Sequence, residues 1–333
     1  MAVLDQKVDK NYAIYNADCI EVMNIIPEKS IGYSIFSPPY SNLYAYSNSD
    51  RDIGNCRSDS EFFEHFDYVI AGLMRVMMPG RNVSVDCMNL PAMKSRDGYI
   101  GLKDFRGELI RAFISKGFIY HSEHVIWKDP LIEATRTKAI GLMHKQLCKD
   151  SALVRAGLPQ YLLTFRAPGE NKHPIPHEQG LTEFIGENEP VNGNLSHERW
   201  RRLASPVWMD IRSTRTLNYR GGRDDDDERH ICPMALDIIE RGLQLWSNPD
   251  DVVFDPFTGI GSTAYCSLTS GRKFIGSELK ASYFKMALNN LPDRRLVYDN
   301  DLLFPIETYD PSYPGQDVTG DPLWEKIYAG VEC

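Results

Sequence analysis

The chain has 333 residues, of which 42% are hydrophobic and 25% charged, and its formal net charge at pH 7 is −9. This length predicts one large α/β domain with an inserted or appended second region. No segment approaches the roughly 20 apolar residues that span a bilayer, and the first residues lack the apolar core of a secretory signal, so we expect no membrane contact and a cytoplasmic location. The seven cysteines include no Cys-x-x-Cys pair, which indicates reduced thiols.

The first part of the chain alternates between apolar runs typical of buried strands and segments with helical spacing. In chain order, the pattern predicts a strand over 12–15, a helix over 17–26, a strand over 31–36, a polar loop over 41–60, a helix over 61–78, a strand over 82–86, a helix over 105–116 and a strand over 118–127. The helix over 61–78 is expected to end at Pro79-Gly80. This alternation predicts a mostly parallel sheet.

The alternation fades between 128 and 204, where Pro, Gly, Asn and His accumulate, and we interpret this segment as a separate recognition region. It resumes after the acidic run 224–228. There the pattern predicts a helix over 234–246, a strand over 252–254, a helix over 262–269, a strand over 273–276 and a helix over 281–289. The chain is thus expected to divide into 1–127, 128–204, 205–293 and an irregular tail over 294–333.

The negative net charge argues against a polyanionic partner, but the basic residues are unevenly distributed. Between 128 and 166, seven Lys or Arg (128, 136, 138, 145, 149, 155 and 166) stand against three acids (129, 133 and 150). Between 195 and 223, seven Arg (199, 201, 202, 212, 215, 220 and 223) stand against two acids (198 and 210). Such segments could bind phosphates, or they could form ordinary solvated faces.

A glycine-containing turn follows the predicted strand over 252–254. It reads Asp255-Pro-Phe-Thr-Gly-Ile-Gly-Ser262 and opens a predicted helix, the place where an open α/β sheet binds a nucleotide-like ligand. Gly259 and Gly261 allow a tight turn and close approach of a ligand. Glu278 follows Gly259 by 19 residues, which suits a carboxylate that accepts both hydroxyls of a ribose. The G-x-G-x-x-G pattern is incomplete, which favours an adenosine without a pyrophosphate; an ordinary turn is the alternative.

A second segment, Phe36-Ser-Pro-Pro-Tyr40, ends the predicted strand over 31–36. Its prolines restrict the chain and fix the neighbouring carbonyl groups. Ser37 Oγ and the Pro38 carbonyl could both accept hydrogen bonds from an –NH₂ group, and Tyr40 offers a ring on which a planar base could stack. Alternatively, the segment is a rigid turn that closes a strand.

Together and in this order, the two segments resemble the DNA amino-methyltransferases (N4-cytosine and N6-adenine) of the permuted β group, in which the catalytic motif precedes the cofactor motif. The segments 15–23, 205–210 and 229–233 add to the resemblance, which covers roughly 12–293 and leaves the middle region unmatched. It implies a doubly wound, mostly parallel, seven-stranded-type sheet of the Rossmann-like class I methyltransferases, circularly permuted and with an inserted target-recognition region. It also implies S-adenosylmethionine as cofactor and double-stranded DNA as partner.

The resemblance assigns roles to single residues and to each segment. The segment 1–127 would form the catalytic half, 128–204 the target-recognition region and 205–293 the cofactor half. The catalytic residues would be Ser37, Pro38, Pro39 and Tyr40. Cofactor contacts would come from Asp18, His230, Pro233, Asp255, Pro256, Phe257, Gly259, Gly261, Ser262 and Glu278. DNA contacts would come from Arg136, Lys138, Lys145, Arg199, Arg201 and Arg202. We expect no metal, because His173 and His177 have no Cys or carboxylate cluster beside them.

The resemblance leaves several alternatives open. A Ser at the first motif position favours N4 of cytosine, whereas Asp is commoner in N6-adenine enzymes of the family. Cytosine C5 chemistry would need a Cys after a Pro, but Cys232-Pro233 has the opposite order. The remaining hypotheses are a methyltransferase for RNA or a protein amide, a non-catalytic DNA-binding module, and a nucleoside or nicotinamide enzyme. A homodimer and a cognate restriction endonuclease are partners that the resemblance suggests. The recognition sequence is not predictable from these residues.

Overall fold

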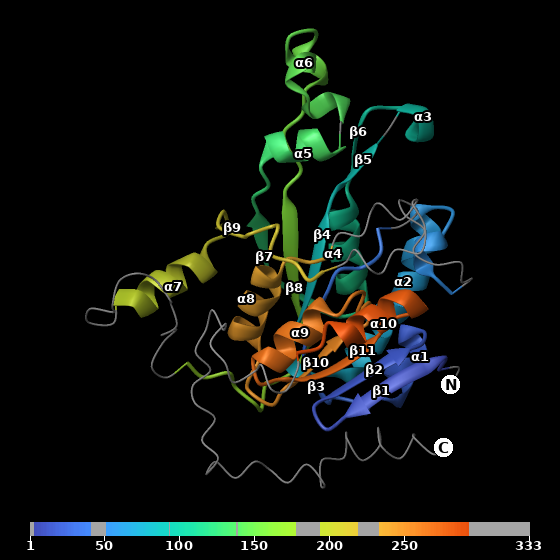
Figure 1. Cartoon of the computed structure of the whole chain (residues 1–333), viewed down its shortest axis with the longest axis vertical. Helices are drawn as coiled ribbons and strands as arrows, with labels where there is room; N and C mark the ends of the chain where they lie inside the picture. Colours follow the sequence, from blue (N-terminus) through green and yellow to red (C-terminus); the bar gives the residue numbers. More distant parts are fainter. Residues whose placement is uncertain are drawn as a thin grey trace.

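The computed structural model describes residues 3–40, 51–92, 94–137, 139–177, 194–218 and 233–292. Within these ranges, nine strands form one sheet in the order β1-β2-β11-β10-β3-β4-β8-β7-β9 (Figure 1). The strands are β1 (Asp5–Asp9), β2 (Tyr12–Asn16), β3 (Ile31–Phe36), β4 (Met77–Met88), β7 (Ile119–Ile126), β8 (Gln160–Arg166), β9 (Val207–Trp208), β10 (Val252–Asp255) and β11 (Lys273–Ser277). The five strands from β2 to β4 are mutually parallel, whereas β8 is antiparallel to both β4 and β7.

Helices cover both faces of the sheet, so the fold is doubly wound. One core contains residues of α1 (Cys19–Ile25), α2 (Asp59–Val76) and α4 (Phe105–Ser115). The opposite core contains residues of α8 (Leu236–Trp246), α9 (Ser262–Thr269) and α10 (Ala281–Asn289). All six residues of β3 are buried, which explains its apolar sequence without polar alternation. The expected doubly wound and mostly parallel α/β fold is confirmed.

Most predicted elements lie where the sequence placed them, but the end of α2 differs. The helix ends at Val76, and β4 begins at Met77 and continues through Pro79-Gly80 to Met88. The prediction that Pro79-Gly80 forms a break between helix and strand is therefore wrong. Gly80 adopts φ +72°, and the pairing of β3 with β4 shifts between Ile31 and Tyr33, so the Pro-Gly pair lies in a bulge of the strand.

Strand β8 is the main element that the sequence did not predict. It lies inside the segment 128–204, yet it is a central strand of the sheet, with β4 on one side and β7 on the other. Leu162, Leu163 and Phe165 of this strand are fully buried. Residues 160–166 therefore belong to the α/β domain, and only the stretches on either side of β8 remain as candidates for target recognition.

Two arms extend beyond the sheet at the end where β4 stops and β8 begins (Figure 1). One contains a small antiparallel pair, and the other consists of short helices joined by 3₁₀ turns. The first is formed by β5 (Leu90–Ala92), α3 (Lys94–Asp97) and β6 (Gly101–Lys103), and the second contains α5 (Pro130–Thr137) and α6 (His144–Leu147). A further helix, α7 (Asn194–Ala204), precedes β9. None of the helices in the described ranges is long and apolar enough to cross a membrane.

Candidate active site

The two sequence motifs lie side by side at one edge of the sheet. Strands β3 and β10 are adjacent and parallel, with Tyr33 beside Val253 and Ser34 beside Phe254, so both end at the same edge. Ser37-Pro-Pro-Tyr40 follows β3, and the glycine turn follows β10. The rings of Phe36 and Phe257, one from each motif, pack with centroids 5.7 Å apart. Segments about 220 residues apart in sequence therefore form one site, at the edge where open α/β sheets bind their ligands.

The glycine turn is held by its own backbone and by Asp255. The Phe257 N–H donates to Asp255 Oδ1 at 2.9 Å, and the Gly261 N–H donates to the Thr258 carbonyl at 2.9 Å. Burial raises the pKa of Asp255 to about 7. Ser262 begins α9, and its hydroxyl oxygen is buried without a hydrogen-bond partner among the described residues. The turn is thus held by internal hydrogen bonds, and one polar group at its helix end is buried without a partner in the described part of the chain.

Glu278 lies directly after β11 and faces the glycine turn. One carboxylate oxygen accepts from the Gly259 N–H at 2.8 Å, and the other accepts from the Lys280 N–H at 2.8 Å. Burial is the main cause that raises the pKa of Glu278 to about 8, although the two N–H groups oppose it. Each oxygen keeps a lone pair beyond these bonds, so the carboxylate can accept two further hydroxyl donors.

Asn16 positions Glu278, and the other predicted cofactor residues outside the turn have separate environments. Asn16 Nδ2 donates to the carbonyls of Glu278 at 2.7 Å and of Leu279 at 3.0 Å, a positioning contact that the sequence did not predict. Asp18 accepts from the Ile20 N–H at 2.8 Å and so caps α1. Pro233 is half-buried before α8. His230 lies outside the described residues.

The two glycines of the turn differ in the space around them. Both have left-handed backbones, with φ +55° at Gly259 and +89° at Gly261. A Cβ added at Gly261 would lie 3.1 Å from the Cα of Ala287 in α10, whereas one added at Gly259 would meet, among the described residues, only the Phe257 carbonyl, at 3.9 Å. Gly261 is therefore required by packing, and the open space above Gly259 suits the approach of a ligand.

We expect Gly261→Ala to lower the free energy of unfolding by about 2–4 kcal/mol, because left-handed strain and an overlap with α10 backbone act together. Gly271→Ala is the matched control, since Gly271 has φ +71° but no atom of the described part of the chain within 4 Å of an added Cβ. It should lose only about 1–2 kcal/mol, from strain alone. Urea unfolding of both variants measures the difference, and equal losses would contradict the packing argument.

Ser37 donates its hydroxyl hydrogen to the backbone carbonyl of Asp86 at 3.1 Å. Its oxygen lone pairs therefore remain available as acceptors. Pro38 is buried, and the ring of half-buried Tyr40 packs against that of Phe105 with centroids 5.9 Å apart. The segment thus presents a fixed acceptor at Ser37 and a supported aromatic ring at Tyr40.

Asp86 and Gln160 extend this site in a way that the sequence did not predict. Gln160 Nε2 donates to both carboxylate oxygens of Asp86, at 2.6 and 2.7 Å, and both side chains are buried. Burial raises the pKa of Asp86 to about 7, against the effects of Gln160 and Lys128. Asp86 stands at the end of a predicted strand, a signal that was present in the sequence. Gln160 begins β8, which the sequence pattern did not reveal.

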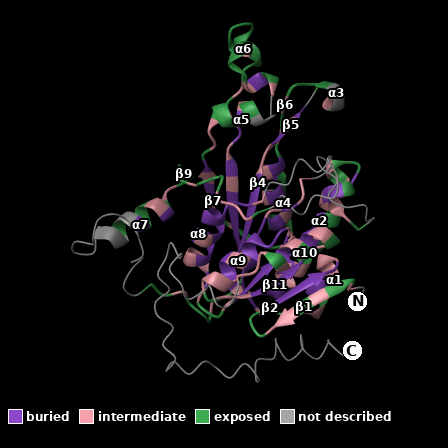
Figure 2. Cartoon of the chain, viewed as in Figure 1, coloured by how far each residue is buried: buried purple, intermediate pink, exposed green. Residues whose placement is uncertain are grey.

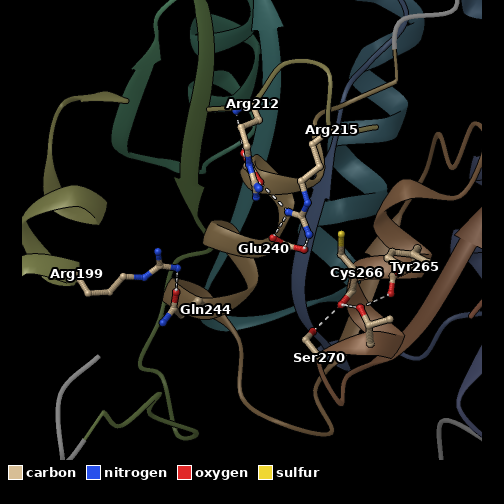
Figure 3. Close-up of polar contacts among 10 residues, drawn as sticks. Arg199, Arg212, Arg215, Glu240, Gln244, Tyr265, Cys266 and Ser270 are labelled. Carbon is tan, nitrogen blue, oxygen red and sulfur yellow. Dashed lines mark hydrogen bonds and ion pairs between the residues drawn. The ribbon is translucent and has the colours of Figure 1, made fainter. Parts of the chain in front are cut away.

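The predicted DNA-binding residues have different environments. Lys145 and Arg201 are exposed and Arg202 is half-buried, while Lys138 and the side chain of Arg136 lie outside what the structure describes. Arg199 is less accessible than the other three, although its predicted contact with DNA stays a prediction. Only 6% of it is exposed, and its Nη2 donates to Gln244 of α8 at 2.8 Å, so it ties α7 to α8 (Figure 3).

Other arginines of the basic segment 195–223 are also engaged within the protein. Arg212 donates to Asp237 at 2.7 Å, and Arg215 donates to Glu240 at 2.6 Å; both acids lie on α8 (Figure 3). Arg241 of α8 in turn donates to Asp210 at 2.7 Å. The count of basic residues in this segment therefore overstates the positive charge available to a polyanion. Across the described residues, no group of three or more His, Cys, Asp or Glu side chains could hold a metal.

The chain resembles known proteins over most of its length. The family model N6_N4_Mtase, described as DNA methylase, matches residues 32–289. The orphan methyltransferase M.BamHII of Bacillus amyloliquefaciens is 46% identical over 275 residues, which cover 82% of this chain and 93% of that protein.

Two solved structures share the fold. TTHA0409 of Thermus thermophilus, complexed with S-adenosyl-L-methionine, has a TM-score of 0.59 at 21% identity and covers 83% of this chain and 93% of its own. The cytosine-N4-specific PvuII DNA methyltransferase has a TM-score of 0.57 at 18% identity and covers 85% of this chain and 87% of its own. At these identities the two structures show the fold alone. The family model and the relative with 46% identity together show that the chain belongs to the N6/N4 DNA methylase family.

Proposed function

We propose that the chain transfers a methyl group from S-adenosylmethionine to the exocyclic amino group of a flipped DNA base, and that this group is N4 of cytosine. The observation that carries the proposal is the meeting of Ser37-Pro-Pro-Tyr40 and the glycine turn at the ends of adjacent strands. A donor bound at the turn and a base held by Ser37 would then face each other, as methyl transfer requires.

The residues at the turn fit S-adenosylmethionine. The space over Gly259 admits a ligand, and the Glu278 carboxylate keeps lone pairs for two ribose hydroxyls. The half-buried ring of Phe257 would supply an apolar contact beside them. When bound, the cofactor supplies a methyl group on a positively charged sulfur.

The chain's own task is to orient and polarise a weak nucleophile. The lone pair of an exocyclic amine is delocalised into the ring of the base. Acceptors at Ser37 Oγ and at the Pro38 carbonyl would hold its two N–H bonds and favour a pyramidal nitrogen. As positive charge develops on that nitrogen, the same fixed dipoles stabilise it. The Tyr40 ring, supported by Phe105, would hold the plane of the base by stacking.

The environment of Ser37 supports cytosine over adenine as the target. Its hydroxyl is a neutral acceptor whose hydrogen is already donated to the Asp86 backbone carbonyl. The first motif position therefore carries a serine in place of the Asp that is commoner in N6-adenine enzymes of the family. N6-adenine methylation is the alternative with the same mechanism. A non-catalytic DNA-binding module is the alternative from another class, and an intact set of turn, Glu278 and Ser37 contacts speaks against it.

Product analysis distinguishes these functions. The purified chain is incubated with labelled S-adenosylmethionine and unmethylated genomic DNA, which is then digested to nucleosides. We expect labelled N4-methylcytosine. Labelled N6-methyladenine would keep the mechanism and overturn the base assignment, whereas cofactor binding without any labelled nucleoside would favour the non-catalytic module.

A further inference from the structure

Helix α5 has an unusual distribution of polar and apolar residues. Glu133 is buried, with 6% of the residue exposed, whereas Leu131 and Ile132 are 74% and 64% exposed. The Leu158 N–H donates to Glu133 Oε2 at 3.0 Å, so the carboxylate anchors the helix to the chain that enters β8. Asp129 accepts from the Leu131 N–H at 2.8 Å and fixes the other end. Two apolar side chains are thereby presented to solvent on a helix that is held in place.

The helix extends from the same edge of the sheet at which the catalytic residues lie. It begins four residues after β7 ends at Ile126, which pairs with Gln160, and Gln160 donates to Asp86. Leu158, the anchor of Glu133, is two residues before Gln160. Leu131 and Ile132 therefore lie beyond the same edge of the sheet at which β3 ends before Ser37.

The arm formed by residues 128–158 is both apolar and basic. Its exposed large apolar residues continue from α5 toward α6, and Figure 2 shows both helices as mostly exposed. Between 128 and 155, the sequence has six Lys or Arg (128, 136, 138, 145, 149 and 155) and three acids (129, 133 and 150), in a chain whose net charge is −9; Lys138 and the side chain of Arg136 lie outside the described residues. One of these acids, Glu133, is buried. This local excess of positive charge complements a polyanion. Exposed apolar side chains next to basic residues suit a duplex in which a base step is unstacked, because they can take the place of the lost stacking.

We infer that Leu131 and Ile132 form an apolar wedge that enters the base stack of duplex DNA beside the base delivered to Ser37. This inference rests on the proposed function and adds the means by which the duplex is opened. Flipping a base breaks its pair and its stacking, and apolar side chains that replace the lost stacking reduce that cost. An unpaired target base needs no such help.

The test compares two substrates for the double variant Leu131→Ser/Ile132→Ser. One is a duplex that carries a recognition sequence located beforehand by sequencing of genomic DNA methylated by the wild type, and the other is the same duplex with an abasic position opposite the target base. For the variant, kcat/KM on the paired duplex should fall roughly 10- to 100-fold, while kcat/KM on the abasic duplex should stay within about threefold of the wild type. Ile119→Ser is the matched control, because Ile119 is 49% exposed at the opposite end of β7 and should leave both values unchanged.

Any other result overturns the inference of a wedge. An equal loss of kcat/KM on both substrates means that Leu131 and Ile132 support the fold or the chemistry. No loss on either substrate means that the duplex opens without these two side chains. If sedimentation shows that the variant loses a dimer that the wild type forms, the arm binds a second copy of the chain. A wild type that methylates neither DNA refutes the proposed function itself, which separates the two failures.

Discussion

Replacing Ser37 with alanine is expected to lower kcat roughly 100- to 1,000-fold, the usual effect of removing one fixed polar group that stabilises a transition state. The hydroxyl oxygen would accept from the target amine only while its hydrogen is held by the Asp86 carbonyl. Alanine removes this acceptor without filling the space above the glycine turn. The affinity for S-adenosylmethionine should therefore stay within about twofold of the wild type, which single-turnover kinetics and a cofactor titration measure separately.

Ser34→Ala is a closely matched control for this variant. Ser34 lies on the same strand, is fully buried, and donates to the Phe254 carbonyl at 2.8 Å. Both alanine variants thus lose one serine-to-carbonyl hydrogen bond, and each should cost about 1 kcal/mol of stability. Only Ser37→Ala should slow methyl transfer. If the two variants have the same kcat, Ser37 acts through strand packing and its role as an acceptor is refuted.

The parts of the fold that the sequence predicted well are those with a strong local pattern. The apolar run of β3 is followed by two prolines, and α9 is preceded by a turn whose left-handed backbones favour glycine. Each of these boundaries is therefore set by residues a few positions away in the sequence. The meeting of the two motifs was predictable too, because parallel strands end at one edge of a sheet. Local chemistry therefore located the centre of the site.

The features that the sequence missed depend on distant partners. The pair of Gln160 and Asp86 is 74 residues apart in sequence, and it exists only because β8 inserts between β4 and β7. The environment of Arg199 was not predictable from the sequence either. Its charge suggested a phosphate contact, but burial against α8 is decided by tertiary packing that a count of charges does not contain. Pro79-Gly80 looked like a break because a bulge inside a strand has the same composition as a turn.

Glu278→Gln is expected to weaken S-adenosylmethionine binding by about 30-fold or more at pH 8.5. Each hydrogen bond to a charged group contributes about 1.5–3 kcal/mol, and the amide keeps the shape of the side chain but loses the charge and one acceptor. The folded chain should remain intact, since the amide oxygen can still accept from the Gly259 N–H. A cofactor titration by calorimetry measures the loss. An affinity equal to that of the wild type would show that Glu278 does not hold the ribose.

The same residue predicts how cofactor binding depends on pH. The pKa of Glu278 is raised to about 8, so below that pH the site holds a proton that must leave before both oxygens can accept hydroxyls. The association constant of the wild type for S-adenosylmethionine should rise with pH, by up to tenfold per unit, and level off above about pH 8.

The stability of the cofactor-free protein should change with pH in the opposite direction. The folded state holds this proton more tightly than the unfolded chain does, so the free energy of unfolding falls as pH rises from about 4.5 to 8. Because the pKa values of Asp86 and Asp255 are also raised, the part due to Glu278 is the part that Glu278→Gln abolishes. A variant that binds weakly but keeps the full pH dependence would assign the titration to one of those two carboxylates instead.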